Sequence, residues 1–127
     1  MQENENNTNL NVTFDKIDHD ILLVKLSGKI IDQATSNELS SRVTTELSND
    51  RNHLILDLSE VDYINSNGLN SLISILTKTR TQGGEMVVFG INEKVQKLLL
   101  ITKLSSVFTI TETFEEAKNQ FNQIKQN

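Results

Sequence analysis

A short apolar run, a polar turn and a stretch of helical periodicity follow one another in the middle of this sequence and constrain its fold most strongly. Residues 53–58 have the length and composition of a buried β-strand and are flanked by polar residues. Apolar residues then recur at helical spacing from Leu69 onward, and a Gly-Gly pair at residues 83–84 follows where a helix would end. The pattern predicts a strand, a turn and an amphipathic helix of about four turns.

The turn between this strand and this helix presents one serine, Ser66. Because Ser66 precedes the periodic apolar residues, its hydroxyl is expected at or near the helix N-cap. The free N–H groups and the positive dipole end of the helix could hold a phosphate there, with a gain of about 0.3 to 2 kcal/mol. From the residues alone, a structural cap and a phosphorylation site are both open interpretations.

The rest of the sequence predicts further strands and helices. Apolar runs at residues 12–17 and 21–26, separated by a polar trio, predict an antiparallel hairpin that Gly28 closes. A β-branched run at residues 85–90 predicts a strand inside the sheet, and residues 107–110 predict a last short strand. Three further helices are expected after Asp32, Asn92 and Thr113. The inward face of the first includes Ala34, Leu39, Val43 and Leu47, and that of the second includes Val95, Leu98 and Leu99. The inward face of the third includes Phe114, Ala117, Phe121 and Ile124.

The predicted order of elements is β-β-α-β-α-β-α-β-α. Helices between the later strands imply at least partly parallel pairing, while the opening hairpin makes the sheet mixed. We therefore expect a single α/β domain over residues 10–127, with a mixed sheet of about four to five strands and about four helices. Residues 1–9 contain no apolar side chain after Met1 and are expected to form a disordered tail.

Composition narrows the functions open to this chain. It has 127 residues, a net charge of −5 and no cysteine, which suits one domain without disulfides or thiol chemistry. The acidic charge and the lack of Lys and Arg clusters argue against nucleic-acid binding. The longest apolar run, residues 98–101, is too short to span a membrane, and the N-terminus lacks a signal-peptide pattern. We therefore expect a cytoplasmic protein with no membrane or nucleic-acid partner.

No catalytic set stands out in the sequence. His19 and His53 lack the companion ligands of a metal site, and Ser66 lacks the glycine pattern of a nucleophile elbow. We therefore expect neither an enzyme nor a metal or other cofactor. Asp57 resembles the phospho-accepting aspartate of receiver domains, but Ser27 and its neighbours stand where such a domain needs an acidic pair. A bond from Asp57 to the local backbone is the preferred interpretation.

Two adjacent motifs resemble the signature of a known family. LDLS at residues 56–59 and VDYINSNGL at residues 61–69 are similar to the signature of the STAS domain, in particular that of bacterial anti-sigma factor antagonists. Further similar segments extend the likeness over residues 10–124. The resemblance implies a mixed β-sheet with helices, in a module that binds an anti-sigma factor which is also a serine kinase. It also implies that the kinase phosphorylates a hydroxyl residue and is thereby released, and that a serine phosphatase restores binding.

Carried over by position, the resemblance makes Ser66 the phosphorylated residue and places the partner-binding surface at Tyr63, Asn65, Ser66, Asn67 and Gly68. Asn65 stands where the family usually has aspartate, and Asn67 where it usually has a second hydroxyl residue. If the family's carboxylate orients the serine in the kinase, phosphorylation here would be slow or absent. Gly68 either lets a partner approach the backbone closely or packs beneath a neighbouring strand.

Three functional classes follow. The leading one is a phosphorylation-switchable module that sequesters an anti-sigma factor, expected as a monomer or a weak homodimer. The second is a non-phosphorylated STAS scaffold or dimerisation module in another signalling or transport assembly. The third, a small enzyme or ligand carrier, is disfavoured by the lack of a catalytic set. For the loop before Ser66 we expect Ile64 to be buried and Tyr63 to be partly exposed.

Overall fold

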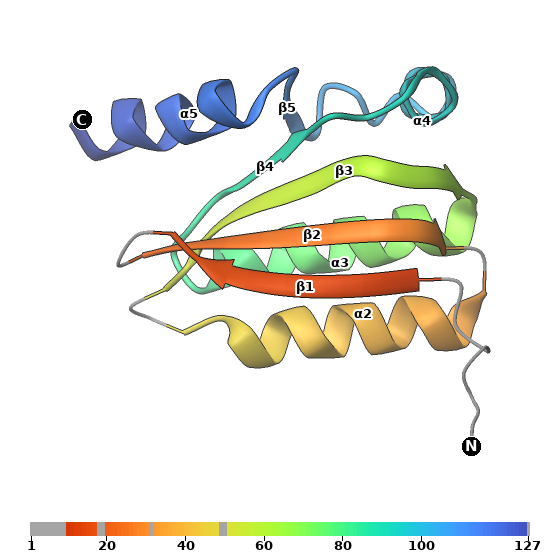
Figure 1. Ribbon diagram of the computed structural model, residues 1–127, viewed down its shortest axis with the longest axis horizontal. Coiled ribbons are helices and arrows are strands. Elements are labelled where there is room, and N and C mark those ends of the chain that lie inside the picture. Colours follow the sequence, from red (N-terminus) through yellow and green to blue (C-terminus); the bar gives the residue numbers. More distant parts are fainter. Residues whose placement is uncertain (1–9, 18–19, 31, 49–50, 127) are drawn as a thin grey trace.

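The computed structural model describes residues 10–17, 20–30, 32–48 and 51–126, with side chains described as far as Asn122. The predicted tail, most of the predicted hairpin turn and the side chain of Ile124 lie outside these residues. Strands and helices follow the predicted order, so the predicted fold class is confirmed. The elements are β1 (Leu10–Lys16), β2 (Ile21–Ile30), α2 (Gln33–Glu46), β3 (His53–Ile64), α3 (Ser66–Thr81), β4 (Met86–Phe89), α4 (Glu93–Ile101), β5 (Thr109–Thr111) and α5 (Phe114–Gln126) (Figure 1).

The five strands form one sheet in the order β1-β2-β3-β4-β5. β1 pairs antiparallel with β2, which confirms the predicted hairpin, and the later neighbours pair in parallel. β4 lies between β3 and β5, inside the sheet as predicted. Because the carboxyl ends of parallel strands share one edge, α2, α3 and α4 all begin at the same end of the molecule (Figure 1).

Two strands are longer than the sequence predicts. β2 continues beyond Gly28 to Ile30, and β3 continues well beyond its predicted end to Ile64. The two extensions pair with each other, with Gly28 opposite Val61 and Ile30 opposite Ile64. Gly28 has a φ of 109° at a shift in register, so it forms a bulge and does not close the strand. The expectation of a loop at residues 63–64 is likewise wrong, because this backbone is paired in the sheet.

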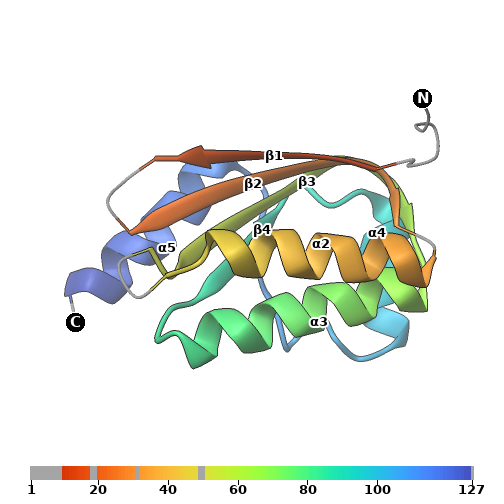
Figure 2. The same cartoon turned by 90° about the horizontal axis from the view of Figure 1, so that it is seen from below.

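Side chains of the sheet alternate between two cores, because successive residues of a strand point to opposite faces. Leu54 and Leu56 of β3 belong to the larger core, with residues of α2 and α3, whereas Ile55 between them belongs to a smaller core. Ala117 and Phe121 of α5 complete that smaller core. Figure 2 shows α2 and α3 side by side against the sheet. The smaller core places α5 on the opposite face, because Ile55 points away from Leu54 and Leu56.

Three helices begin where the sequence predicts them, and each has a side-chain cap. Asp32, Asn92 and Thr113 accept hydrogen bonds from backbone N–H groups in the first turns of α2, α4 and α5. The bond from the Thr35 N–H to Asp32 Oδ1 is 2.6 Å long. It lowers the pKa of Asp32, because it stabilises the carboxylate over the neutral acid.

The inward faces of the helices mostly follow the predicted spacing, with one exception in α2. Ala34 is exposed, although the sequence suggested a place on the apolar stripe. The buried residues of α2 are Ser36, Leu39 and Val43, and a residue two positions before Ser36 points away from that face. In α4 and α5 the predicted inward residues that are buried are Val95, Leu99, Ala117 and Phe121.

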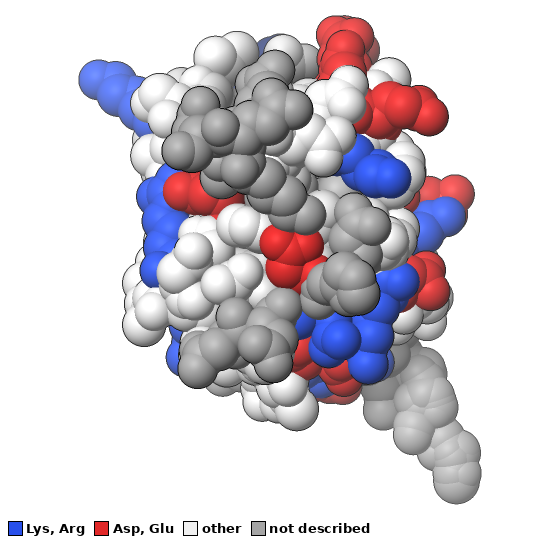
Figure 3. Space-filling view, turned by 90° about the vertical axis from the view of Figure 1, so that its left-hand side faces the viewer, with Lys and Arg blue, Asp and Glu red and all other residues white. Residues whose placement is uncertain are grey.

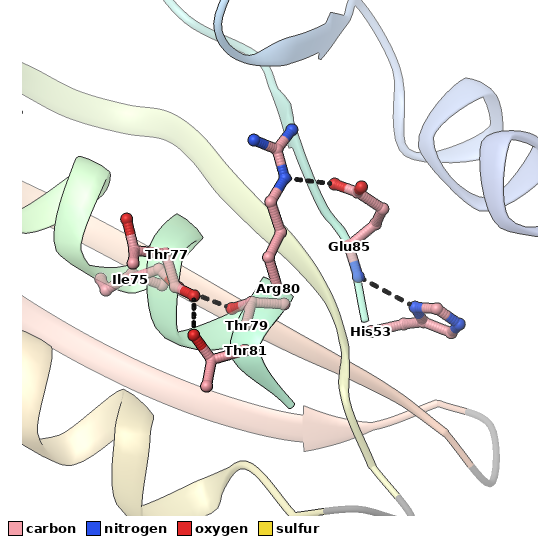
Figure 4. A network of polar contacts seen from close by, with 7 residues as sticks. All are labelled: His53, Ile75, Thr77, Thr79, Arg80, Thr81 and Glu85. Atoms are coloured by element: carbon pink, nitrogen blue, oxygen red, sulfur yellow. Dashed lines mark hydrogen bonds and ion pairs between the residues drawn. The ribbon is translucent and has the colours of Figure 1, made fainter. Parts of the chain in front are cut away.

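At the end of the molecule opposite the start of α3, hydrogen bonds hold the connection between α3 and β4 in place (Figure 4). Arg80 Nε donates to Glu85 Oε1 at 3.2 Å, and the Glu85 N–H donates to His53 Nδ1 at 3.2 Å. Asn52 Nδ2 donates to the carbonyl of Gln82 at 2.9 Å. These bonds tie the connection to the start of β3. In the described part of this end, acidic and basic side chains lie interspersed on the surface (Figure 3).

The closest approach in this connection involves Gly84, which is buried and whose added Cβ would overlap the carbonyl group of Asn52. We expect Gly84→Ala to lower the free energy of unfolding by about 2 to 4 kcal/mol, because backbone must move to admit the methyl group. Urea unfolding followed by circular dichroism measures this loss.

Gly83→Asn is the matched control for Gly84→Ala. Gly83 has a φ of 88°, and a Cβ there would lie 3.6 Å from the Asn52 side chain, which is ordinary contact. Asparagine tolerates positive φ better than most residues, so a loss of at most about 1 kcal/mol is expected. Equal losses in both variants would show that the turn conformation, and not the approach of Gly84 to Asn52, governs stability here.

Candidate functional site

The first turn of α3 is capped by Asn65, not by Ser66. Asn65 Oδ1 accepts hydrogen bonds from the N–H groups of Asn67 at 2.9 Å and Gly68 at 3.4 Å. The Asn65 carbonyl accepts the first intrahelical bond, from the Leu69 N–H at 2.9 Å. Ser66 lies next to the cap, as the first residue of the helix. The capping role that the sequence allowed for Ser66 therefore belongs to Asn65.

Ser66 is exposed, and among the described residues its hydroxyl takes part in no hydrogen bond. Neither the cap nor the packing of α3 depends on this side chain. The first turn of α3 also contains no acidic residue, whereas Lys78 and Arg80 lie in the last turn. The exposed hydroxyl thus lies at the positive end of a helix dipole that no carboxylate of its own first turn offsets.

Contacts from two other elements fix the backbone of this turn. The Asn65 N–H donates to the carbonyl of Ile30 at the end of β2, at 3.3 Å. Ser36 Oγ of α2 donates to the carbonyl of Asn67 at 2.8 Å, and Ser36 is only 3% exposed. Sequence reasoning missed Ser36. Its signal was a small polar residue that keeps helical register with the buried residues Leu39 and Val43.

Gly68 provides the space in which α3 meets the sheet. It is buried, and an added Cβ would lie 2.8 Å from the carbonyl oxygen of Ile30 and 2.8 Å from the Cβ of Ile64. Both distances are shorter than real Cβ atoms normally show. The geometry therefore favours the packing alternative for Gly68, with β2 and β3 as the neighbouring strands.

The predicted site residues come together at the junction of β3 and α3, with unequal exposure. Tyr63, at 46%, and Ser66 are exposed. Asn65 and Asn67 are partly buried, and Gly68 is buried. Ile64, as expected, is buried at 1% exposure, between the exposed Tyr63 and Asn65. Side chains available to a partner are therefore chiefly those of Tyr63 and Ser66.

Asp57 has a local structural role, as the sequence interpretation preferred. Its Oδ1 accepts from the Ser59 N–H at 2.9 Å and from the Ser59 hydroxyl at 2.7 Å. Within the described ranges, no cluster of three or more His, Cys, Asp or Glu side chains is arranged to hold a metal ion. The helices in those ranges also include none that is long and apolar enough to cross a membrane.

Residues 14–117 match the STAS domain, and the chain therefore belongs to the STAS domain family. One relative, BtrV of Bordetella bronchiseptica, is named as an anti-sigma factor antagonist. It is 27% identical to this chain over 112 residues, which cover 88% of this chain and 95% of BtrV. The anti-sigma F factor antagonist of Paenibacillus polymyxa is 26% identical over 106 residues, covering 83% of this chain and 87% of the relative.

Solved structures share the fold. The Bacillus cell fate determinant SpoIIAA in its phosphorylated form has a TM-score of 0.67 at 12% identity, covering 87% of this chain and 99% of SpoIIAA. At this identity the likeness concerns the fold alone.

The contact of Gly68 with Ile30 and Ile64 predicts that a side chain at position 68 is costly. We expect Gly68→Ala to lower the free energy of unfolding by about 1 to 3 kcal/mol, because α3 must move away from the strand ends. Urea unfolding gives the value. Asn70→Ala, at an exposed position of the same helix, is the control and should change stability by less than about 0.5 kcal/mol. Wild-type stability of Gly68→Ala would contradict the packing interpretation.

Proposed function

We propose that this protein is an anti-sigma factor antagonist, and that phosphorylation of Ser66 controls its binding to the anti-sigma factor. The observation that carries the proposal is the exposed Ser66 hydroxyl, held at the start of α3 by a cap and a backbone that do not use it. The names of the two sequence relatives support the class of function. SpoIIAA, which shares the fold, has been solved in a phosphorylated form.

Phosphorylation of Ser66 would leave the fold intact. A phosphoserine carries a charge of about −1.5 to −2 near neutral pH. At the start of α3 this charge would meet the positive dipole end and no acidic side chain of the first turn. Because Ser66 is exposed and neither caps nor packs, the phosphate would disrupt no described contact.

The same phosphate would weaken a protein contact at this surface. A partner that covers Tyr63 and Ser66 would have to desolvate the phosphate or face it with its own charges. A loss of about 3 to 4 kcal/mol weakens binding by about two to three decades, which suffices for a switch. The proposed partners are an anti-sigma factor that acts as the serine kinase and a phosphatase that reverses the reaction, in the cytoplasm. Asn65, Asn67 and Gly68 would contribute mainly through the backbone they hold.

Asn65 favours one further candidate function, a binding module that is not phosphorylated. Its side chain is engaged in capping α3 through an acceptor oxygen, a task that aspartate performs equally well. For these capping bonds, the difference between the two residues is therefore charge alone. If the kinase needs that charge, the unmodified protein would bind its partner constitutively, as a scaffold or dimerisation unit.

Replacement of Ser66 tests the switch. We expect Ser66→Ala to abolish phosphorylation and to bind the anti-sigma factor as the wild type does, because the unmodified hydroxyl only permits binding. Ser66→Asp should weaken binding by at least about tenfold, because it places a negative charge in the contact. Co-purification and mass spectrometry identify the partner and the phosphorylated residue, and titration calorimetry with the purified partner gives each affinity.

Two comparisons make this test specific. Both Ser66 variants should melt close to the wild type, since Asn65 supplies the cap. Ser41→Asp adds the same charge on the exposed side of α2 and should bind normally. Wild-type affinity of Ser66→Asp, or a phosphate on another serine, would refute the switch at Ser66.

The charge at position 65 gives a separate prediction. We expect Asn65→Asp to be phosphorylated faster by the cognate kinase, because it restores the family's residue at nearly constant volume. Its melting temperature should stay close to the wild-type value, since aspartate accepts the same two N–H bonds. A phosphate-transfer assay with the purified kinase measures the rate. An unchanged rate would mean that position 65 does not limit phosphate transfer.

A further inference from the structure

An apolar groove lies between α4 and the end of β3, the strand that precedes Ser66 in the chain. Its volume is about 210 Å³, and Tyr63 and Ile64 line it on the β3 side. Leu98 and Ile101 line it on the α4 side, together with the buried Val95. The extension of β3 in the sheet thus builds one wall of the groove, and the same segment leads directly into Ser66.

The walls of this groove expose large apolar side chains. Ile101 is 72% exposed and Tyr63 is 46% exposed. Contiguous apolar surface of this kind, next to a hollow, is typical of protein contacts. The groove can receive apolar side chains of another segment without rearrangement of the two cores.

Two lysines give the groove a positive charge. Lys94 and Lys97 are the charged residues among those described that line it. They share one face of α4 with Leu98 and Ile101, because the four positions are spaced i, i+3, i+4 and i+7. This face is therefore apolar and basic in a chain whose net charge is −5.

We propose that this groove binds an acidic amphipathic helix of the anti-sigma factor. Apolar side chains of the helix would fill the space between Tyr63 and Ile101, and its carboxylates would pair with Lys94 and Lys97. The inference rests on the proposed function in taking the anti-sigma factor as the partner, and it adds the chemistry of the segment that the partner supplies.

Two other occupants fit the groove less well. A second copy of this chain, docked groove to groove, would bring Lys94 and Lys97 of both copies together without an acidic lining residue to offset them. The chain's own residues 1–9 include two glutamates but only one apolar residue, Met1, and so offer little to fill the groove.

A direct test uses a synthetic acidic amphipathic peptide of about 18 residues, with leucines at i, i+3, i+4 and i+7 and glutamates beside them. We expect it to shift the amide NMR signals of Tyr63, Lys94 and Ile101 of the isotope-labelled full chain. A peptide with lysines in place of the glutamates should not. Absence of shifts with the acidic peptide, or equal shifts with both peptides, would overturn the proposal.

Variants of α4 test the groove with the purified anti-sigma factor. Ile101→Ser and the double variant Lys94→Glu/Lys97→Glu should each weaken binding by at least about tenfold. Leu100→Ser is the matched control, because Leu100 is 60% exposed on the same helix but does not line this groove. It should bind as the wild type does. All three variants change exposed positions, and melting temperatures near the wild-type value verify their folding.

The outcomes separate this inference from the proposed function. If Ser66→Asp weakens binding but the Ile101 and lysine variants bind normally, the groove assignment fails and the switch stands. If the groove variants lose the partner and the peptide binds, but Ser66→Asp binds normally, the switch fails and the groove stands. Groove signals that change with protein concentration, or on removal of residues 1–9, without added peptide would assign the groove to a second copy or to the chain's own tail and overturn the proposal.

Discussion

The site depends on the close contact of α3 with the paired ends of β2 and β3. Gly68 meets Ile30 and Ile64 at distances that leave no room for a side chain, and the Asn65 N–H bonds to the Ile30 carbonyl. Because Ile30 and Ile64 are partners in the sheet, the strand pairing and the start of α3 form one unit. The positions of the neighbouring Tyr63 and Ser66 follow from this contact and need no stabilising role for either side chain.

Local patterns in the sequence were sufficient for the order of elements, the mixed sheet and most inward helix faces. They failed to predict where β2 and β3 end, because the ends of these strands depend on their pairing with each other. The polar Ser59 and Glu60 look like the end of β3, and Gly28 looks like the end of β2. In the structure each strand continues because the other is there to pair with it, and Gly28 supports a bulge. The local sequence of one strand does not show which distant segment it pairs with, so it does not predict how far the pairing extends.

The candidate site was predicted from the resemblance more than from local chemistry. Sequence reasoning placed Ser66 at or near the N-cap and did not consider Asn65, although asparagine is an equally good capping residue. In the structure Asn65 is the cap, because β3 stays paired through Ile64 and Asn65 is the first residue outside the strand, in the extended conformation that a cap requires. Ser36 was missed because its bond to Asn67 crosses from another helix. Because Asn65 caps α3, the Ser66 side chain has no capping role, and the family's aspartate at position 65 would change the charge beside Ser66 while keeping an acceptor for the cap.

The groove and the switch would be coupled by electrostatics. Ile64 lines the groove and precedes Ser66 by two residues, a backbone span of at most about 7 Å. This is shorter than the screening length of about 8 to 10 Å at physiological salt. A phosphate on Ser66 would therefore repel carboxylates of a bound helix that lie near the Ile64 end of the groove. One modification would then act on both parts of the contact, without any change in the fold that presents them.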